Sequence, residues 1–171
     1  MSKVLESPAK PIYLEEISSP KTAFFFLILT LLLLFMAVVR WIVTGMDWLA
    51  ALLCAFSAMF LFYVLNFQVL LIKITPGVLS LRFGIFAWTV PLNNIADCRI
   101  DDIPLLMRIG GAGIHFMFIR KRYRVSFNFL EYPRVVVSLK RKAGLVSDIS
   151  FTTRQPGKVV KTILGIKSAS G

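Results

Sequence analysis

Side chains able to perform acid–base or metal chemistry are scarce in this 171-residue sequence. His115 is the single histidine, which excludes an imidazole-rich metal site and a catalytic set built on several histidines. On an apolar strand, a lone histidine is most often a packed or half-exposed side chain. The sequence therefore predicts no catalytic residue and no cofactor, and it indicates a protein that is not an enzyme.

The main acidic cluster is formed by Asp97, Asp101 and Asp102. Carboxylates can hold a divalent cation. However, Arg99, Arg108 and the cations at 120–124 offer these aspartates ion pairs. Ion pairing is the simpler interpretation, so no metal site is predicted.

The glycine-rich stretch GGAGIHF, residues 110–116, invites comparison with a phosphate-binding loop. It lacks the Lys-Ser/Thr pair of a P-loop, and it precedes a strand-like run instead of a helix. We interpret Gly110, Gly111 and Gly113 as a structural turn, because glycine permits positive φ angles and a close approach between chain segments.

The next stretch, IHFMFIRKRYR at 114–124, sets aromatic side chains beside four cations. Alternation along a strand would place Phe116, Phe118 and Arg120 on one face. Two interpretations remain open: a solvated turn between two strands, or an edge that meets lipid phosphates or docks a partner protein. The candidate contact residues are Phe116, Phe118, Arg120, Lys121, Arg122 and Arg124.

Two uncharged segments, residues 23–39 and 48–72, precede this region. About 18 to 20 apolar residues suffice to cross a bilayer. The sequence predicts a transmembrane helical hairpin at residues 22–67, with helices at about 22–43 and 48–67. A signal peptide is the competing interpretation of the first segment, but a polar lead precedes it and a second span follows closely. Trp41 and Trp48 lie where interfacial aromatic anchors are expected.

Charge is concentrated after the hairpin, which is followed by 16 of the 20 Lys and Arg residues and 5 of the 9 Asp and Glu residues. Lys21 and Lys73 flank the spans, whereas Arg40 alone lies between them. The positive-inside rule then predicts a multi-pass protein of the inner (plasma) membrane with both termini in the cytoplasm. Each cation near an anionic leaflet contributes about 1 kcal/mol of attraction.

From Val69 the pattern changes to short β-branched and aromatic runs broken by turn signals. Strands are predicted near residues 78–83, 87–90, 95–100, 114–119, 123–129, 135–139 and 148–152. Seven or eight short strands are typical of a sandwich or an open barrel. Thr153 and Pro156 mark the start of an amphipathic helix that is expected to end at Gly165, before a disordered tail at 166–171.

The hairpin, the stretch ITPGVLSLRFGIFAWTVPLNNIADCRI at 74–100 and RIGGAGIHF at 108–116 together resemble bacterial membrane proteins with a pleckstrin-homology-like (PH-like) domain. Pro91, Leu92 and Ile95 match the Pro-Leu-x-x-Ile step of that family. The resemblance covers about residues 20 to 165. It implies a membrane α-helical hairpin followed by an all-β PH-like barrel of about seven strands, closed by a C-terminal α-helix.

The expected organisation is a cytoplasmic N-terminal segment at 1–21, the hairpin, and a cytoplasmic PH-like domain at 68–165. The resemblance implies a binding or assembly role: docking of a second copy or of another membrane protein, with anionic lipid as a secondary contact. Nucleic acid is not expected as a partner, because a short connection holds the basic domain at the membrane. The alternative is a small accessory subunit of a membrane transporter or respiratory complex, with the hairpin as the interface.

Overall fold

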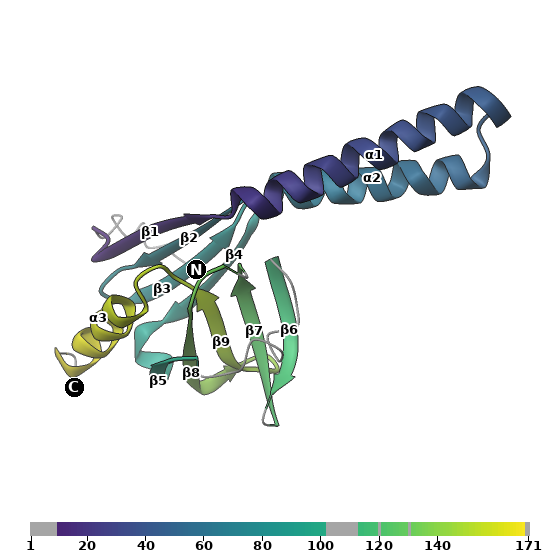
Figure 1. Cartoon of the computed structure of the whole chain (residues 1–171). Helices are drawn as coiled ribbons and strands as arrows, with labels where there is room; N and C mark the ends of the chain where they lie inside the picture. Colours follow the sequence, from purple (N-terminus) through teal and green to yellow (C-terminus); the bar gives the residue numbers. More distant parts are fainter. Residues whose placement is uncertain (1–9, 102–112, 120, 130, 170–171) are drawn as a thin grey trace, which may run out of the picture.

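The computed structural model describes residues 10–101, 113–119, 121–129 and 131–169. Two long helices, α1 (Pro20–Thr44) and α2 (Trp48–Asn66), form a hairpin that projects from a β-rich domain (Figure 1). Both helices are long and apolar enough to cross a membrane, and their bounds agree closely with the predicted spans. Ser19 caps α1 by accepting a hydrogen bond from Thr22 N at 3.4 Å.

Small side chains line the seam between the two helices. Thr30 and Ala37 of α1 are buried, as are three α2 residues at seven-residue spacing, Ala50, Ser57 and Val64. Small residues let two helix backbones approach closely in a membrane. Ser57 also donates a hydrogen bond to the Thr30 carbonyl oxygen at 3.0 Å.

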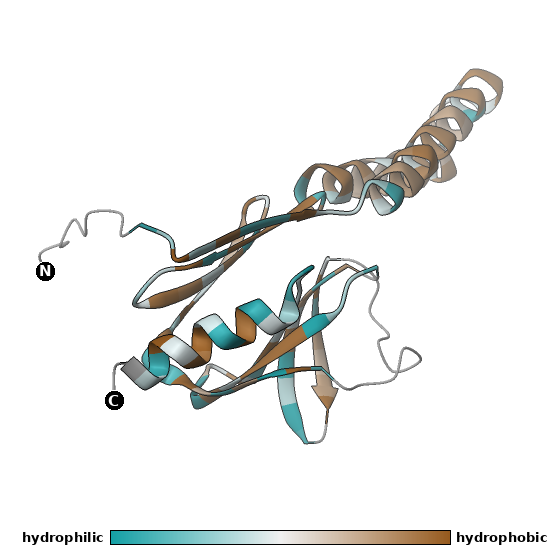
Figure 2. Cartoon of the chain, turned by 60° about the vertical axis from the view of Figure 1, so that its left-hand side comes forward, coloured by the Kyte–Doolittle hydropathy of each residue, from teal (hydrophilic) through white to brown (hydrophobic). Residues whose placement is uncertain are grey.

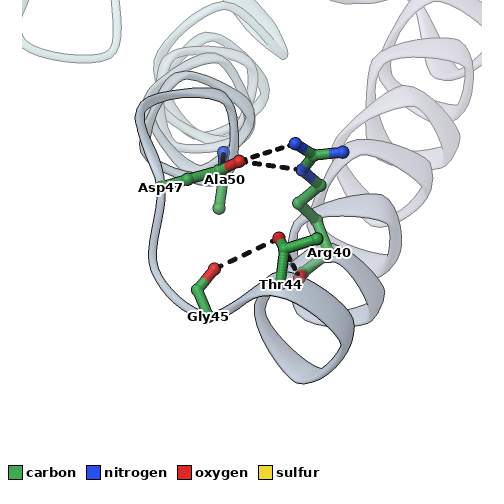
Figure 3. A network of polar contacts seen from close by, with 5 residues as sticks. All are labelled: Arg40, Thr44, Gly45, Asp47 and Ala50. Carbon is green, nitrogen blue, oxygen red and sulfur yellow. Dashed lines mark hydrogen bonds and ion pairs between the residues drawn. The ribbon is translucent and has the colours of Figure 1, made fainter.

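An ion pair closes the distal turn of the hairpin (Figure 3). The Arg40 guanidinium donates to one carboxylate oxygen of Asp47, at 3.0 Å from Nε and 2.7 Å from Nη2. The other Asp47 oxygen caps α2 by accepting from Ala50 N at 2.9 Å. Asp47 therefore both neutralises the single cation of the turn and satisfies a free amide at the start of α2.

The described strands form two sheets. The first is antiparallel, in the order β1 (Tyr13–Ser18), β2 (Val69–Ile74), β3 (Val78–Phe83) and β4 (Phe86–Pro91). A 3-10 turn, η1 (Leu92–Asn94), leads into the second sheet. That sheet has the order β5 (Ile95–Ile100), β8 (Arg134–Ala143), β9 (Val146–Thr152), β7 (Arg122–Asn128) and β6 (Gly113–Ile119), with β7 and β9 parallel.

The hydrophobic core lies between these sheets. Alternation along β3 buries Leu79, Leu81 and Phe83, and Phe127 and Phe151 belong to the same core. Helix α3 (Pro156–Ala169) adds the buried side chains Val159 and Ile163. In Figure 2 α3 lies along one side of the domain, between the two sheets.

The expected seven-stranded barrel is not what the described residues form. They contain nine strands, and within them no strand pairing joins β4 to β6 or β1 to β5. The domain is thus a two-sheet structure with a C-terminal helix. Helix α3 contacts β5, β8 and η1, and Lys158 lies 5.7 Å from the centre of the Tyr13 ring, so this helix occupies the side between the β1 and β5 edges.

Strand β1 lies within the segment 1–21 that was expected to be a separate N-terminal region. It pairs along its length with β2, from Tyr13 opposite Ile74 to Ser18 opposite Val69. Its apolar pattern is interrupted by Glu15, whose carboxylate accepts hydrogen bonds from Thr153 Oγ1 at 2.6 Å and Arg154 N at 2.9 Å. The acidic side chain is thus satisfied by the residues that precede α3, which lie far away in the sequence.

Helix α3 also continues past Gly165, where the sequence predicted its end. Ile166 packs against the core, and Lys167 Nζ donates a hydrogen bond to the Ala96 carbonyl oxygen at 2.6 Å. These contacts hold the last turn of the helix, so the tail expected at 166–171 is helical as far as Ala169.

Candidate functional site

A continuous series of aromatic rings joins the hairpin to the core of the domain. Ring centres are separated by 4.4 Å between Phe26 and Tyr63, 4.8 Å between Tyr63 and Phe67, and 5.5 Å between Phe67 and Phe83. Phe83 then stacks on Phe127 at 6.1 Å. Each such pair contributes about 0.5–1.5 kcal/mol beyond the area that it buries. The end of α2 is therefore packed into the β-domain, which fixes the domain's orientation relative to the helices.

Gly113 fits against this series. Its φ of 109° is positive, and a Cβ at this position would lie 3.1 Å from Tyr63 Oη. Both its backbone angle and its close contact favour glycine at this position, which is the first residue of β6. Gly110 and Gly111 lie outside the described residues.

The domain side that α3 leaves open carries an apolar groove of about 520 Å³. It lies between β4 and β6, whose outer edges pair with no further strand among the described residues. Its lining residues are Phe67, Ile85, Phe86, Ala87, Trp88, Ile114, Phe116 and Phe127. None of these side chains is charged. In Figure 1 β6 is the strand of its sheet nearest the side toward which the hairpin projects. Phe67, the residue that follows α2, lines the groove, so the groove lies beside the base of the hairpin.

The predicted contact residues Phe116 and Phe118 are exposed, with 68% and 62% of their surface accessible. Phe116 pairs with Val125 and Phe118 with Tyr123, so both phenylalanines project from the core side of the sheet. They remain exposed because the opposing four-stranded sheet does not cover β6. Phe116 lines the groove, whereas Phe118 continues the apolar edge beyond it.

The four predicted cations do not form one exposed cluster. Lys121 lies at the β6–β7 turn with a φ of 63° and is exposed, and Arg122 is half-exposed, with Nη2 2.9 Å from Asp148 Oδ1. Arg124 is instead 4% exposed and pairs with Asp101 at 3.3 Å. Alternation turns its side chain to the opposite face of the strand from Tyr123 and Val125, which corrects its assignment to the contact surface. Arg120 lies outside the described residues.

The acidic cluster also behaves as an ion-pairing group. Asp97 binds Arg99 at 2.7 Å, and Asp101 binds Arg124. Across the part of the chain that the structure describes, no group of three or more His, Cys, Asp or Glu side chains is arranged to hold a metal ion. Asp102 and Arg108 lie outside that part.

Two buried groups have raised pKa values. Burial, with a contribution from the nearby Asp97 charge, raises the pKa of the Cys98 thiol to about 12. Burial and the hydrogen bond to Glu15 likewise raise the pKa of the Tyr13 hydroxyl to about 12. Both groups are neutral at pH 7, so Cys98 is not a thiolate nucleophile.

Comparison with known protein families, curated protein sequences and solved structures found no match. The candidate site is therefore identified from the structure alone, as the groove together with the β6 edge. An uncharged, aromatic groove beside an exposed apolar strand is suited to binding.

Sequence reasoning missed the part of this site contributed by Ile85, Phe86 and Trp88. Their run of large apolar side chains resembles a buried strand. One signal was present. Ile85 follows Gly84 in the two-residue turn between two strands, where the strand pairing does not bury an apolar side chain. The predicted anchors Trp41 and Trp48 are exposed near the distal ends of α1 and α2, far along the hairpin from the groove.

Proposed function

We propose that this protein is a membrane-anchored, non-enzymatic binding and assembly module with a PH-like domain at the cytoplasmic face of the inner membrane. The observation that carries the proposal is the exposed apolar edge at β6, held beside the base of a hairpin able to cross a membrane. The two-sheet architecture and the C-terminal helix support a PH-like assignment.

The proposed partner is a second copy of this chain or another membrane protein. Phe118 and Tyr123 are both exposed and lie 5.0 Å apart between ring centres. Exposed apolar clusters of this kind mark interaction surfaces. The aromatic series fixes the domain on the hairpin, so this edge keeps a constant height above the membrane. A partner in the same membrane then reaches it by diffusion in the plane of the membrane.

Anionic lipid is the proposed secondary contact. Lys121 and Arg122 stand at the β6–β7 turn, next to this apolar edge. Cations near an anionic leaflet add attraction that salt weakens. The concentration of basic residues after the hairpin supports the cytoplasmic placement of the domain.

The alternative, an accessory subunit that uses the hairpin as its interface, is favoured by a different feature. A second, mainly apolar groove of about 390 Å³ lies along the distal half of the hairpin. Its lining includes Phe35 and Met36 of α1, Leu49 and Leu53 of α2, and the charged Arg40. A transmembrane partner helix would fit this groove.

Site-specific photo-crosslinking in native membranes separates the two functions. A photoreactive amino acid would replace Phe118 on the β6 edge, Phe35 on the hairpin, or, as a control of similar exposure, Leu14 on β1. We expect a protein adduct from position 118 and none from position 14. Adducts from position 35 alone would favour the accessory-subunit function and would contradict docking through β6.

A further inference from the structure

We infer that the groove between β4 and β6 holds an acyl chain of a membrane lipid. This inference rests on the membrane anchoring in the proposed function, and it assigns to the groove an occupant other than the protein partner. Three features support it: the contact between the groove and the end of α2, the uncharged lining, and a cation beside the rim.

The apolar surface of α2 meets the groove through an aromatic contact, beside the polar side chain of Asn66. Phe62, near the end of α2, is exposed and meets Phe86 edge-to-face with ring centres 6.3 Å apart. Phe86 in turn stacks on Phe67 at 5.6 Å. An acyl chain beside α2 therefore reaches the groove by sliding from one aromatic side chain to the next.

The chemistry of the lining suits a lipid tail. All eight lining residues are uncharged and predominantly apolar, and Ile85 and Phe116 at the mouth are largely exposed. An acyl chain has no hydrogen-bond donors or acceptors, so burying it against an apolar lining leaves no polar group of the lipid tail without a partner.

A headgroup partner stands at the β3–β4 turn. Arg82 Nε donates a hydrogen bond to the Gly84 carbonyl oxygen at 2.7 Å, which holds this exposed guanidinium beside the turn that carries Ile85. A lipid whose tail occupies the groove would have its phosphate within reach of this cation. Guanidinium groups bind phosphate oxygens well.

The fluorescence of Trp88, which lines the groove, can report what occupies the groove. The chain has three tryptophans, so replacing Trp41 and Trp48 by phenylalanine leaves only the one that lines the groove. The full-length protein with these two changes would be reconstituted in phosphatidylcholine and phosphatidylglycerol vesicles that carry brominated acyl chains. Bromine quenches indole fluorescence at short range, so we expect strong quenching of Trp88 by the brominated lipids and weak quenching by aqueous acrylamide.

Matched variants test whether the groove causes this quenching. Phe116→Asn, which makes the groove wall polar, should reduce quenching by brominated lipid at least twofold. Phe118→Asn changes an equally exposed residue of the same strand outside the groove and should leave quenching unchanged. If Phe116→Asn lowers the melting temperature, Ile85→Asn, in the exposed turn, replaces it as the groove variant.

Three results would overturn the inference. Efficient acrylamide quenching without bromine quenching would show a groove filled with water. If Trp88 is shielded from both quenchers, and this shielding is lost when the protein is diluted in lipid, a second copy fills the groove. Equal bromine quenching in the Phe116→Asn, Ile85→Asn and Phe118→Asn variants would place the lipid elsewhere. An alkaline wash of the vesicles tests the membrane anchoring separately, because it would remove a protein that is not anchored.

Discussion

Gly84, in the turn between β3 and β4, lies so close to Asn66 that a Cβ at position 84 would be 2.7 Å from the Asn66 carbonyl oxygen. Asn66 is the last residue of α2, and its side chain also accepts a hydrogen bond from Ile85 N at 3.5 Å. This contact brings the β3–β4 turn against the base of the hairpin. The mouth of the groove is thereby fixed relative to the helices.

Replacing Gly84 by alanine should destabilise the protein by more than about 1 kcal/mol. Gly84 has a φ of +48°, which disfavours a side chain, and the new methyl group would clash with backbone atoms of Asn66. Thermal unfolding of the full-length protein in detergent measures the change. Gly77→Ala is the matched control: its Cβ meets nothing within 4 Å, so the expected effect is within about 0.5 kcal/mol. Equal melting temperatures for the two variants would refute the close contact.

The β6 edge and the core should respond differently to loss of an aromatic ring. Phe118→Ser changes an exposed side chain and should alter the free energy of unfolding by less than about 0.5 kcal/mol. Phe127→Ala empties a fully buried position and should cost about 3–5 kcal/mol. Chemical denaturation in detergent distinguishes them. If Phe118→Ser unfolds the protein, Phe118 belongs to the core and not to the docking surface.

The neighbouring cations should likewise separate into two classes. Arg124→Gln would leave Asp101 buried without its partner and should cost about 3–5 kcal/mol. Lys121→Gln, at the exposed turn, should change the stability by less than about 0.5 kcal/mol. If both variants unfold at the same denaturant concentration as the parent, the buried Arg124–Asp101 pair is not formed.

The elements that sequence reasoning found are those encoded in local patterns. The two apolar helices follow from uninterrupted hydrophobic runs, and β3 follows from the alternation of Leu79, Leu81 and Phe83 with more exposed residues. Gly113 has a φ of 109°, which glycine permits, but it lies at the start of β6 and not in a turn.

The features that it missed depend on partners distant in the sequence. Glu15 breaks the pattern of β1, and only its contacts with Thr153 and Arg154 make it acceptable there. Arg124 is one of several adjacent cations, and only its pairing with Asp101 identifies it as buried. The groove arises from two strand edges that no ladder joins among the described residues, and no local pattern encodes which edges remain free.

Alkaline pH should destabilise the fold through Cys98. The pKa of its thiol is raised from 9.0 to about 12 in the folded protein, so above pH 9 the unfolded chain loses a proton that the folded chain retains. The free energy of unfolding must then fall as pH rises from about 9 toward 12. Melting temperatures between pH 8 and pH 11 measure the slope.

Cys98→Ala removes this titrating group and should flatten the slope, even though the smaller side chain lowers the melting temperature at every pH. Part of the slope should persist, because the Tyr13 pKa is also raised, from 10.0 to about 12. An unchanged slope in Cys98→Ala would mean that the thiol is not shielded from water in the folded protein.

The most direct test of membrane anchoring at the cytoplasmic face is thiol labelling in intact cells. Cysteine would be introduced by Met46→Cys in the distal turn or by Ser168→Cys in α3, after replacement of the native Cys54 and Cys98 by alanine. With a membrane-impermeant maleimide, we expect labelling of the Met46→Cys protein alone, and labelling of both proteins once the cells are permeabilised. Labelling of the Ser168→Cys protein in intact cells would place the β-domain outside the cytoplasm and contradict the proposed function.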